Sequence, residues 1–123
     1  MFLSSDPGNP DTAAHFYADL QVLGRIQRHP DPQAFMREFC SWEVAQKANK
    51  WTGPNIGRWP NDAYDQLCRT AEHEMDPVAR AALFIRMNDL SCGNQVIIPV
   101  VYRPRVAAVS SKLQCDISGW DTD

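Results

Sequence analysis

Two helix-start signals in the second half of the chain constrain its fold more than any other feature. Asn61 precedes a run with helical spacing, and Asp76 is followed by Pro77, a residue suited to the first position of a helix. Apolar residues of the first run share one helix face, namely Tyr64, Leu67, Cys68 and Ala71. The second run is apolar around most of its circumference and ends at Gly93. We therefore expect a helix pair whose second member is the central buried helix.

Weaker signals predict two more helices in the first half of the chain. Apolar side chains recur at helical spacing over residues 12–23. Pro30-Asp31-Pro32 supplies a cap and a proline at the first position of a short helix that ends near Cys40. Residues 43–50 have the composition of one further helical turn.

Two apolar runs near the end of the chain have strand composition. Residues 95–102 and 106–109 are rich in valine and isoleucine, but Pro99 lacks the backbone donor that a central strand needs, which indicates an edge, a bulge or a crossover. We predict an α+β fold, four helices with a few short strands, in a single partial domain over residues 1–123.

Composition excludes several classes of partner. A chain of 123 residues is enough for one core, and a net charge of -3 gives no basic excess for binding nucleic acid. No apolar run is long enough to span a bilayer, and residues 1–8 lack the basic start and apolar stretch of a signal peptide. We expect the export signal of an exported parent protein to lie upstream.

The four cysteines do not indicate a zinc site, because none forms a Cys-x-x-Cys pair. Cys40 and Cys68 fall at apolar helical positions and are expected to be small buried side chains. In an oxidising compartment Cys92 with Cys115 is the first pair to test, although four cysteines permit three connectivities.

The sequence carries no recognisable catalytic motif. His15, His29 and His73 each lack a second ligand at a metal-binding spacing, and there is no nucleophile elbow, phosphate loop or dinucleotide fingerprint. Asp62 and Asp65 are explained by their favourable interaction with a helix N-terminus. We expect no enzyme, metal or cofactor, with a hydrolase of unrecognised site as a remaining alternative.

Residues 41–60, called the aromatic loop below, have a composition typical of recognition surfaces. Indole rings offer rigid apolar faces, and neighbouring asparagine and arginine side chains offer directional hydrogen bonds. Trp59 is expected to pack onto the helix that follows it. Trp42 and Trp51 suit a ligand site and a core role equally, and Asn49 lies between them.

Four segments, in order over most of the chain, resemble a known pattern. Pro30-Asp31-Pro32-Gln33-Ala34-Phe35 is similar to Pro-Asp-Pro-x-x-Phe, and Trp59-Pro60-Asn61-Asp62-Ala63-Tyr64-Asp65 to Trp-x-Asn-x-x-Tyr-Asp. Asp76-Pro77-Val78-Ala79-Arg80 is similar to Asp-Pro-x-x-Arg, and Ile98-Pro99 followed by Tyr102-Arg103 resembles an apolar Ile-Pro strand. Together they resemble the C-terminal portion of the family 5 extracellular solute-binding proteins, receptors of oligopeptide and dipeptide ABC importers.

The resemblance implies a type II periplasmic-binding-protein-like fold. Residues 1–98 would belong to the C-terminal lobe, and residues 99–123 would return toward an N-terminal lobe that this chain lacks. It also implies transport: the parent would be periplasmic, or extracellular and membrane-associated, and would bind a peptide or other small solute and deliver it to the membrane permease of an ABC transporter.

One departure from the family pattern bears on the ligand. Peptide binders of the family commonly carry an acidic residue just before the Tyr-Pro-Asp-Pro segment, where this chain has Gln27-Arg28-His29. A cationic Arg28 would repel an ammonium group and favour an anionic or uncharged solute. The candidate ligand-binding residues are Gln27, Arg28, His29, Trp42, Asn49 and Trp51. The alternative is a small free-standing helical interaction domain that docks a partner through the aromatic loop or residues 96–102, and apolar patches should be exposed in either case.

Overall fold

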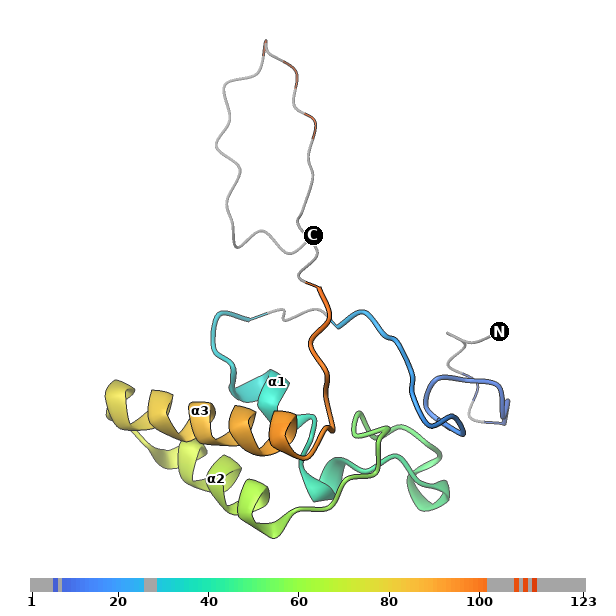
Figure 1. Cartoon of the computed structure of the whole chain (residues 1–123), viewed down its shortest axis with the longest axis horizontal. Helices are drawn as coiled ribbons and strands as arrows, with labels where there is room; N and C mark the ends of the chain where they lie inside the picture. Colours follow the sequence, from blue (N-terminus) through green and yellow to red (C-terminus); the bar gives the residue numbers. More distant parts are fainter. Residues whose placement is uncertain are drawn as a thin grey trace.

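Three α-helices organise the described part of the chain (Figure 1). The computed structural model describes residues 6, 8–25, 29–101, 108, 110 and 112. The elements are α1 (Gln33–Arg37), two short 3-10 helices η1 (Ser41–Glu43) and η2 (Lys47–Asn49), then α2 (Asp62–His73) and α3 (Pro77–Gly93). Helices α2 and α3 lie side by side, and α1 packs against both.

The prediction of an α+β fold is wrong for the described residues, where no strand occurs. The β-type pairing found there is an isolated parallel bridge between Val44 and Asn55. Residues 97–101 carry no regular structure, and Ile98, Val100 and Val101 are exposed. A strand needs a pairing partner, and among the described residues this run has none. Most of the second predicted run, residues 106–109, lies outside the described residues.

The predicted starts of α2 and α3 are confirmed. The side chain of Asn61 accepts the Tyr64 N–H at 2.9 Å, and that of Asp76 accepts the Val78 N–H at 3.1 Å. Each bond satisfies one backbone donor that the first turn of a helix leaves unpaired. The predicted end of α3 at Gly93 is also confirmed.

The prediction that α3 is the central buried helix is wrong. Its buried residues are Phe84, Met87 and Ser91, whereas Val78 and Ile85 are 77% and 62% exposed. A helix that is apolar on all sides needs cover on all sides. Among the described elements α3 packs on α2 and α1, so its outer apolar positions face solvent.

The predicted helix over residues 12–23 does not form. Phe16 has a φ of 36°, in the left-handed region that a right-handed helix excludes. The Thr12 hydroxyl and His15 Nδ1 are 2.7 Å apart, and the His15 N–H donates to the Thr12 carbonyl at 3.1 Å. These contacts close one isolated turn, after which residues 17–25 run on without helical structure.

The core lies where α1, α2 and α3 meet and includes Phe39, Cys40, Tyr64, Cys68, Ala71, Phe84 and Met87. Tyr64 is fully buried, its hydroxyl donates to the Met36 carbonyl at 2.8 Å, and burial raises the pKa of its phenol. The Trp59 ring meets the Tyr64 ring edge-on, with 5.2 Å between centroids. The expectations that Trp59 packs onto the following helix and that Cys40 and Cys68 are buried are therefore confirmed.

Arg80 on α3 links all three helices. Two of its nitrogens bind the Asp31 carboxylate at 2.9 and 3.0 Å, just before α1. Its Nε donates to the Ala71 carbonyl at the end of α2, and the guanidinium lies 4.8 Å from the centre of the Phe84 ring. Asp31 also accepts the Gln33 N–H at 2.9 Å, but Pro32 is the N-cap, so α1 begins one residue later than predicted and, at Arg37, ends before the predicted end near Cys40.

We expect Asp31→Asn to lower the free energy of unfolding by about 0.5 kcal/mol at neutral pH. The hydrogen bonds from Arg80 and from the Gln33 backbone hold the pKa of Asp31 below its usual value. The stabilisation is therefore present above the unfolded pKa of about 3.9 and is lost as the pH falls through the folded pKa. The effect is small because half of the Asp31 side chain is exposed and solvent screens the pair.

Urea unfolding followed by tryptophan fluorescence at several pH values tests this expectation. Asparagine keeps an oxygen for the Gln33 N–H, so the variant isolates the ion pair from the cap. The difference from the unsubstituted chain should vanish at the acidic end. A difference that is unchanged down to pH 2 would contradict it.

Candidate functional site

The aromatic loop has a fixed framework built around Asn55. This side chain is 1% exposed, and its amide nitrogen lies 3.0–3.1 Å from the carbonyl oxygens of Phe39, Cys40 and Trp59. The Asn55 backbone N–H donates to the Glu43 carbonyl at 2.9 Å. The two ends of the loop are thus held together by one buried amide, which satisfies backbone acceptors in the interior.

Trp51 is the residue of the aromatic loop that packs against the N-terminal segment, residues 8–25. Lys50 and Trp51 have φ values of 53° and 61°, and the Trp51 N–H donates to the Gln46 carbonyl at 3.0 Å. The Trp51 ring is 4.4 Å from the His15 ring, centroid to centroid, and 5.1 Å from the guanidinium carbon of Arg58. Trp51 is half-buried, so part of the indole reaches solvent.

Arg58 joins the N-terminal segment to the loop. Its Nε donates to the Ala45 carbonyl at 3.2 Å, and its two terminal nitrogens donate to the carbonyls of Phe16 and His15. All three guanidinium nitrogens of Arg58 therefore donate to backbone carbonyls of the protein itself. The His15 side chain is buried.

Trp42 is the more accessible of the two candidate indoles. It is 39% exposed, and the guanidinium carbon of Arg69 lies 5.0 Å from the centre of its ring. Arg69 also lines an open hollow of about 410 Å³ with Asp62, Asp65 and Gln66 at the start of α2. The hollow offers charges of both signs beside an aromatic face.

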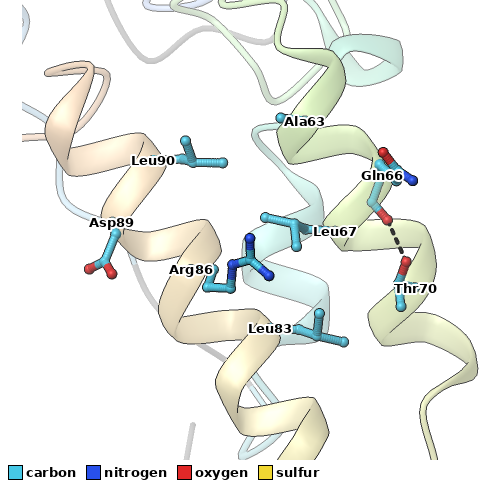
Figure 2. A pocket seen from close by; sticks show the side chains of 8 residues that line it. All are labelled: Ala63, Gln66, Leu67, Thr70, Leu83, Arg86, Asp89 and Leu90. Atoms are coloured by element: carbon cyan, nitrogen blue, oxygen red, sulfur yellow. Dashed lines mark hydrogen bonds between the residues drawn. The ribbon is translucent and has the colours of Figure 1, made fainter.

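A second open hollow, of about 670 Å³, runs between α2 and α3 (Figure 2). Leu67, Leu83 and Leu90 supply its apolar side chains, and Arg86 reaches toward α2 among them. The remaining lining residues are Ala63, Gln66, Thr70 and Asp89. This groove was not predicted from the sequence, which assigned Leu67 to the buried stripe of α2.

The structure does not unite the predicted ligand-binding residues. Trp42 lies beside α2 and Trp51 beside the N-terminal segment, and among the described residues no ring contact joins them. The Asn49 side chain stabilises the start of η2, because it accepts the Gln46 N–H and donates to the Val44 carbonyl. His29 is exposed just before α1. Gln27 and Arg28 lie outside the described residues.

Sequence reasoning missed the contribution of His15 and Arg58 to the surroundings of Trp51. Arg58 and Phe16 are 42 positions apart, and no local pattern reports a contact across that separation. The one available signal was chemical: an arginine inside an aromatic loop is suited to lie over an indole.

Three further observations bear on the class of protein. Among the described residues no group of three or more His, Cys, Asp or Glu side chains is placed to hold a metal ion. Within the same residues, no helix has both the length and the apolar character needed to cross a membrane. Comparisons with protein-family models, with curated proteins and with solved structures found no match.

Proposed function

We propose that this chain is the C-terminal portion of a two-lobed solute receptor, which captures a peptide or a related small solute for an ABC-type importer. The aromatic loop would contribute to the wall of the ligand cleft, and a second lobe would supply the facing wall. The membrane permease of the importer would receive the solute from the closed receptor.

The observation that carries the proposal is that an ion pair joins two of the four segments with family resemblance, and a third contacts the helix that follows the first. Arg80 of the Asp-Pro-x-x-Arg segment binds Asp31 of the Pro-Asp-Pro segment. Tyr64 of the Trp-x-Asn-x-x-Tyr-Asp segment donates to Met36 in the helix that Asp31 opens, and Asp65 accepts the Ser41 N–H at 2.9 Å. Contacts between residues of these segments favour the view that the segments belong to one inherited family pattern and do not match it by chance.

The exposed apolar residues support a role next to another protein body. Tyr17, Leu20 and Val22 in the N-terminal segment are exposed, as are Val100 and Val101. Exposed large apolar residues are typical of surfaces that another body covers. Both hollows of the described residues are open, whereas small-ligand sites usually enclose most of the ligand, so a facing lobe would be needed for tight binding.

Calorimetric titration with short peptides, amino acids and anionic solutes tests the proposal in two arms. We expect the isolated chain to bind none of them more tightly than about 1 mM, and the chain joined to its first lobe to bind one class at about 1 μM or tighter. In the joined receptor, Trp42→Ala should weaken binding by about tenfold if the indole contacts the solute.

Met75→Ala is the matched control, since Met75 is 90% exposed and belongs to the connection between α2 and α3. Figure 1 shows that this connection lies at the opposite end of the helix pair from the aromatic loop. This variant should leave the affinity unchanged. Sub-micromolar binding by the isolated chain would contradict the need for a facing lobe. The absence of an export signal and of a first lobe in the DNA upstream of Met1 would favour the free-standing interaction domain instead.

A further inference from the structure

Cys40 and Cys68 belong to the same buried core cluster. Both are fully buried, Cys40 in the turn that follows α1 and Cys68 within α2. The Ser41 N–H donates to Asp65 at 2.9 Å and the Asn61 N–H donates to the Ser41 hydroxyl at 3.1 Å, so the chain next to Cys40 is fixed against the first turns of α2. Asp65 and Cys68 are separated by three positions and therefore share one helix face.

The two thiols shift each other's pKa. The neighbouring Cys68 thiol, followed by burial, raises the pKa of Cys40, and the Cys40 thiol lowers the pKa of Cys68. The Gln33 side-chain nitrogen donates to the Cys68 sulfur at 3.6 Å. The Gln33 side-chain oxygen is buried without a hydrogen-bond partner in the described part of the chain. The core thus holds a polar pocket of two sulfurs and one amide, which a purely apolar packing role does not require.

We propose that Cys40 and Cys68 are a redox pair that closes into an intramolecular disulfide when the chain meets a low-molecular-weight disulfide such as oxidised glutathione. The pair differs from Cys92 with Cys115, the first choice on sequence grounds. The proposal goes beyond the receptor function and holds whichever function the chain has.

The exchange balances without a further reagent. The Cys68 thiolate attacks one sulfur of oxidised glutathione, breaks its disulfide and releases one glutathione thiolate. Cys40 loses its proton, attacks the Cys68 sulfur of the mixed disulfide and displaces the second glutathione. The two protein sulfurs are oxidised and the two glutathione sulfurs are reduced. Because both thiols are buried, the reaction takes place while the chain folds or opens locally.

The new bond would enclose the whole aromatic loop between its two ends. A disulfide that closes such a loop lowers the entropy of the unfolded chain. We expect the oxidised chain to have a Tm roughly 10 °C above that of the reduced chain. The two sulfurs must approach to about 2.05 Å for the bond to form.

Peptide mapping of the full chain tests the proposal. The protein is refolded with oxidised glutathione, alkylated with N-ethylmaleimide and digested with trypsin. Cleavage after Lys and Arg places each cysteine on a peptide of its own, namely residues 38–47, 59–69, 87–105 and 113–123. We expect residues 38–47 joined to 59–69, with two hydrogen atoms lost and no maleimide on either peptide.

Three results would overturn the proposal: alkylation of both Cys40 and Cys68 after refolding, linkage of residues 87–105 to 113–123 with those two cysteines free, or glutathione retained on Cys68. The Tm of the unsubstituted chain before and after reduction is a second readout that needs no variant. Cys92→Ser is the control and should keep the shift in Tm, whereas Cys68→Ala should abolish it.

Discussion

Asn55→Asp is expected to lower the free energy of unfolding by about 4 kcal/mol at pH 7. The amide nitrogen of Asn55 donates toward three carbonyl oxygens, whereas a carboxylate would oppose them with negative charge in a site that is 1% exposed. Burial and these carbonyls would raise the pKa of the new carboxyl above the unfolded value of about 3.9. The part of the penalty that the charge causes is therefore full above the folded pKa, shrinks as the pH falls through it, and is gone below the unfolded pKa.

Urea unfolding from pH 7 to pH 3 measures this effect, with Asn55→Ala as the matched variant. The alanine removes the same donors without adding a charge, so it should cost about 2 kcal/mol at every pH, relative to the unsubstituted chain. The two variants should thus converge on acidification. An aspartate variant whose penalty does not change between pH 7 and pH 3 would show that the site is open to water.

Gly53→Ala is expected to be the second most damaging single change, at about 3 kcal/mol. A Cβ on Gly53 would lie 2.3 Å from the Glu43 oxygen, 2.6 Å from the Val44 carbonyl carbon and 2.7 Å from the Ala45 nitrogen. These are backbone atoms, so no side-chain rotation relieves the overlap. The paired segments of the aromatic loop would have to separate, which would break the bridge between Val44 and Asn55.

Gly57→Ala is the control within the same loop. A Cβ there meets nothing within 4 Å, so its effect should stay within about 0.5 kcal/mol. Thermal unfolding followed by tryptophan fluorescence compares the two variants. Equal Tm values for both would mean that residues 43–45 and Gly53 do not approach as closely as described.

These two positions also matter for the proposed receptor. Gly53 and Asn55 hold the loop that carries Trp42 and Trp51, so their variants should disturb any ligand site built on those indoles. Loss of binding in such a variant would therefore reflect the framework. The role of Trp42 has to be read from Trp42→Ala, since Trp42 is partly exposed and lies outside the core.

Helix boundaries in this protein depend on short-range chemistry, which is why the sequence predicts them well. The caps by Asn61 and Asp76 each join residues two or three positions apart, and the Asp31 bond to Gln33 opens α1 in the same way. Residue type alone decides such bonds. The predicted helix over residues 12–23 failed because Phe16 adopts a left-handed φ, and its carbonyl is bound by Arg58 from the distant loop.

The candidate site was less accessible to sequence reasoning. The composition of residues 41–60 identified a loop rich in indoles. It did not show that the Asn49 side chain takes part in the capping box of η2, or that His15 packs on Trp51. The predicted strand over residues 95–102 had suitable residues, but within the described part of the chain no strand pairs with it. The composition of a segment gives its preference for the strand conformation. Whether it pairs into a sheet depends on the segments that lie beside it.

By itself the sequence determined where α2 and α3 begin, where α3 ends and which face of α2 is buried, because these follow from bonds and periodicity within one or two helical turns. Only the tertiary structure decided that Asn55 closes the aromatic loop, that Arg80 joins three helices and that Cys40 and Cys68 share one core cluster. Each of those contacts brings together residues from distant parts of the chain, where packing in three dimensions, and not local preference, selects the partner.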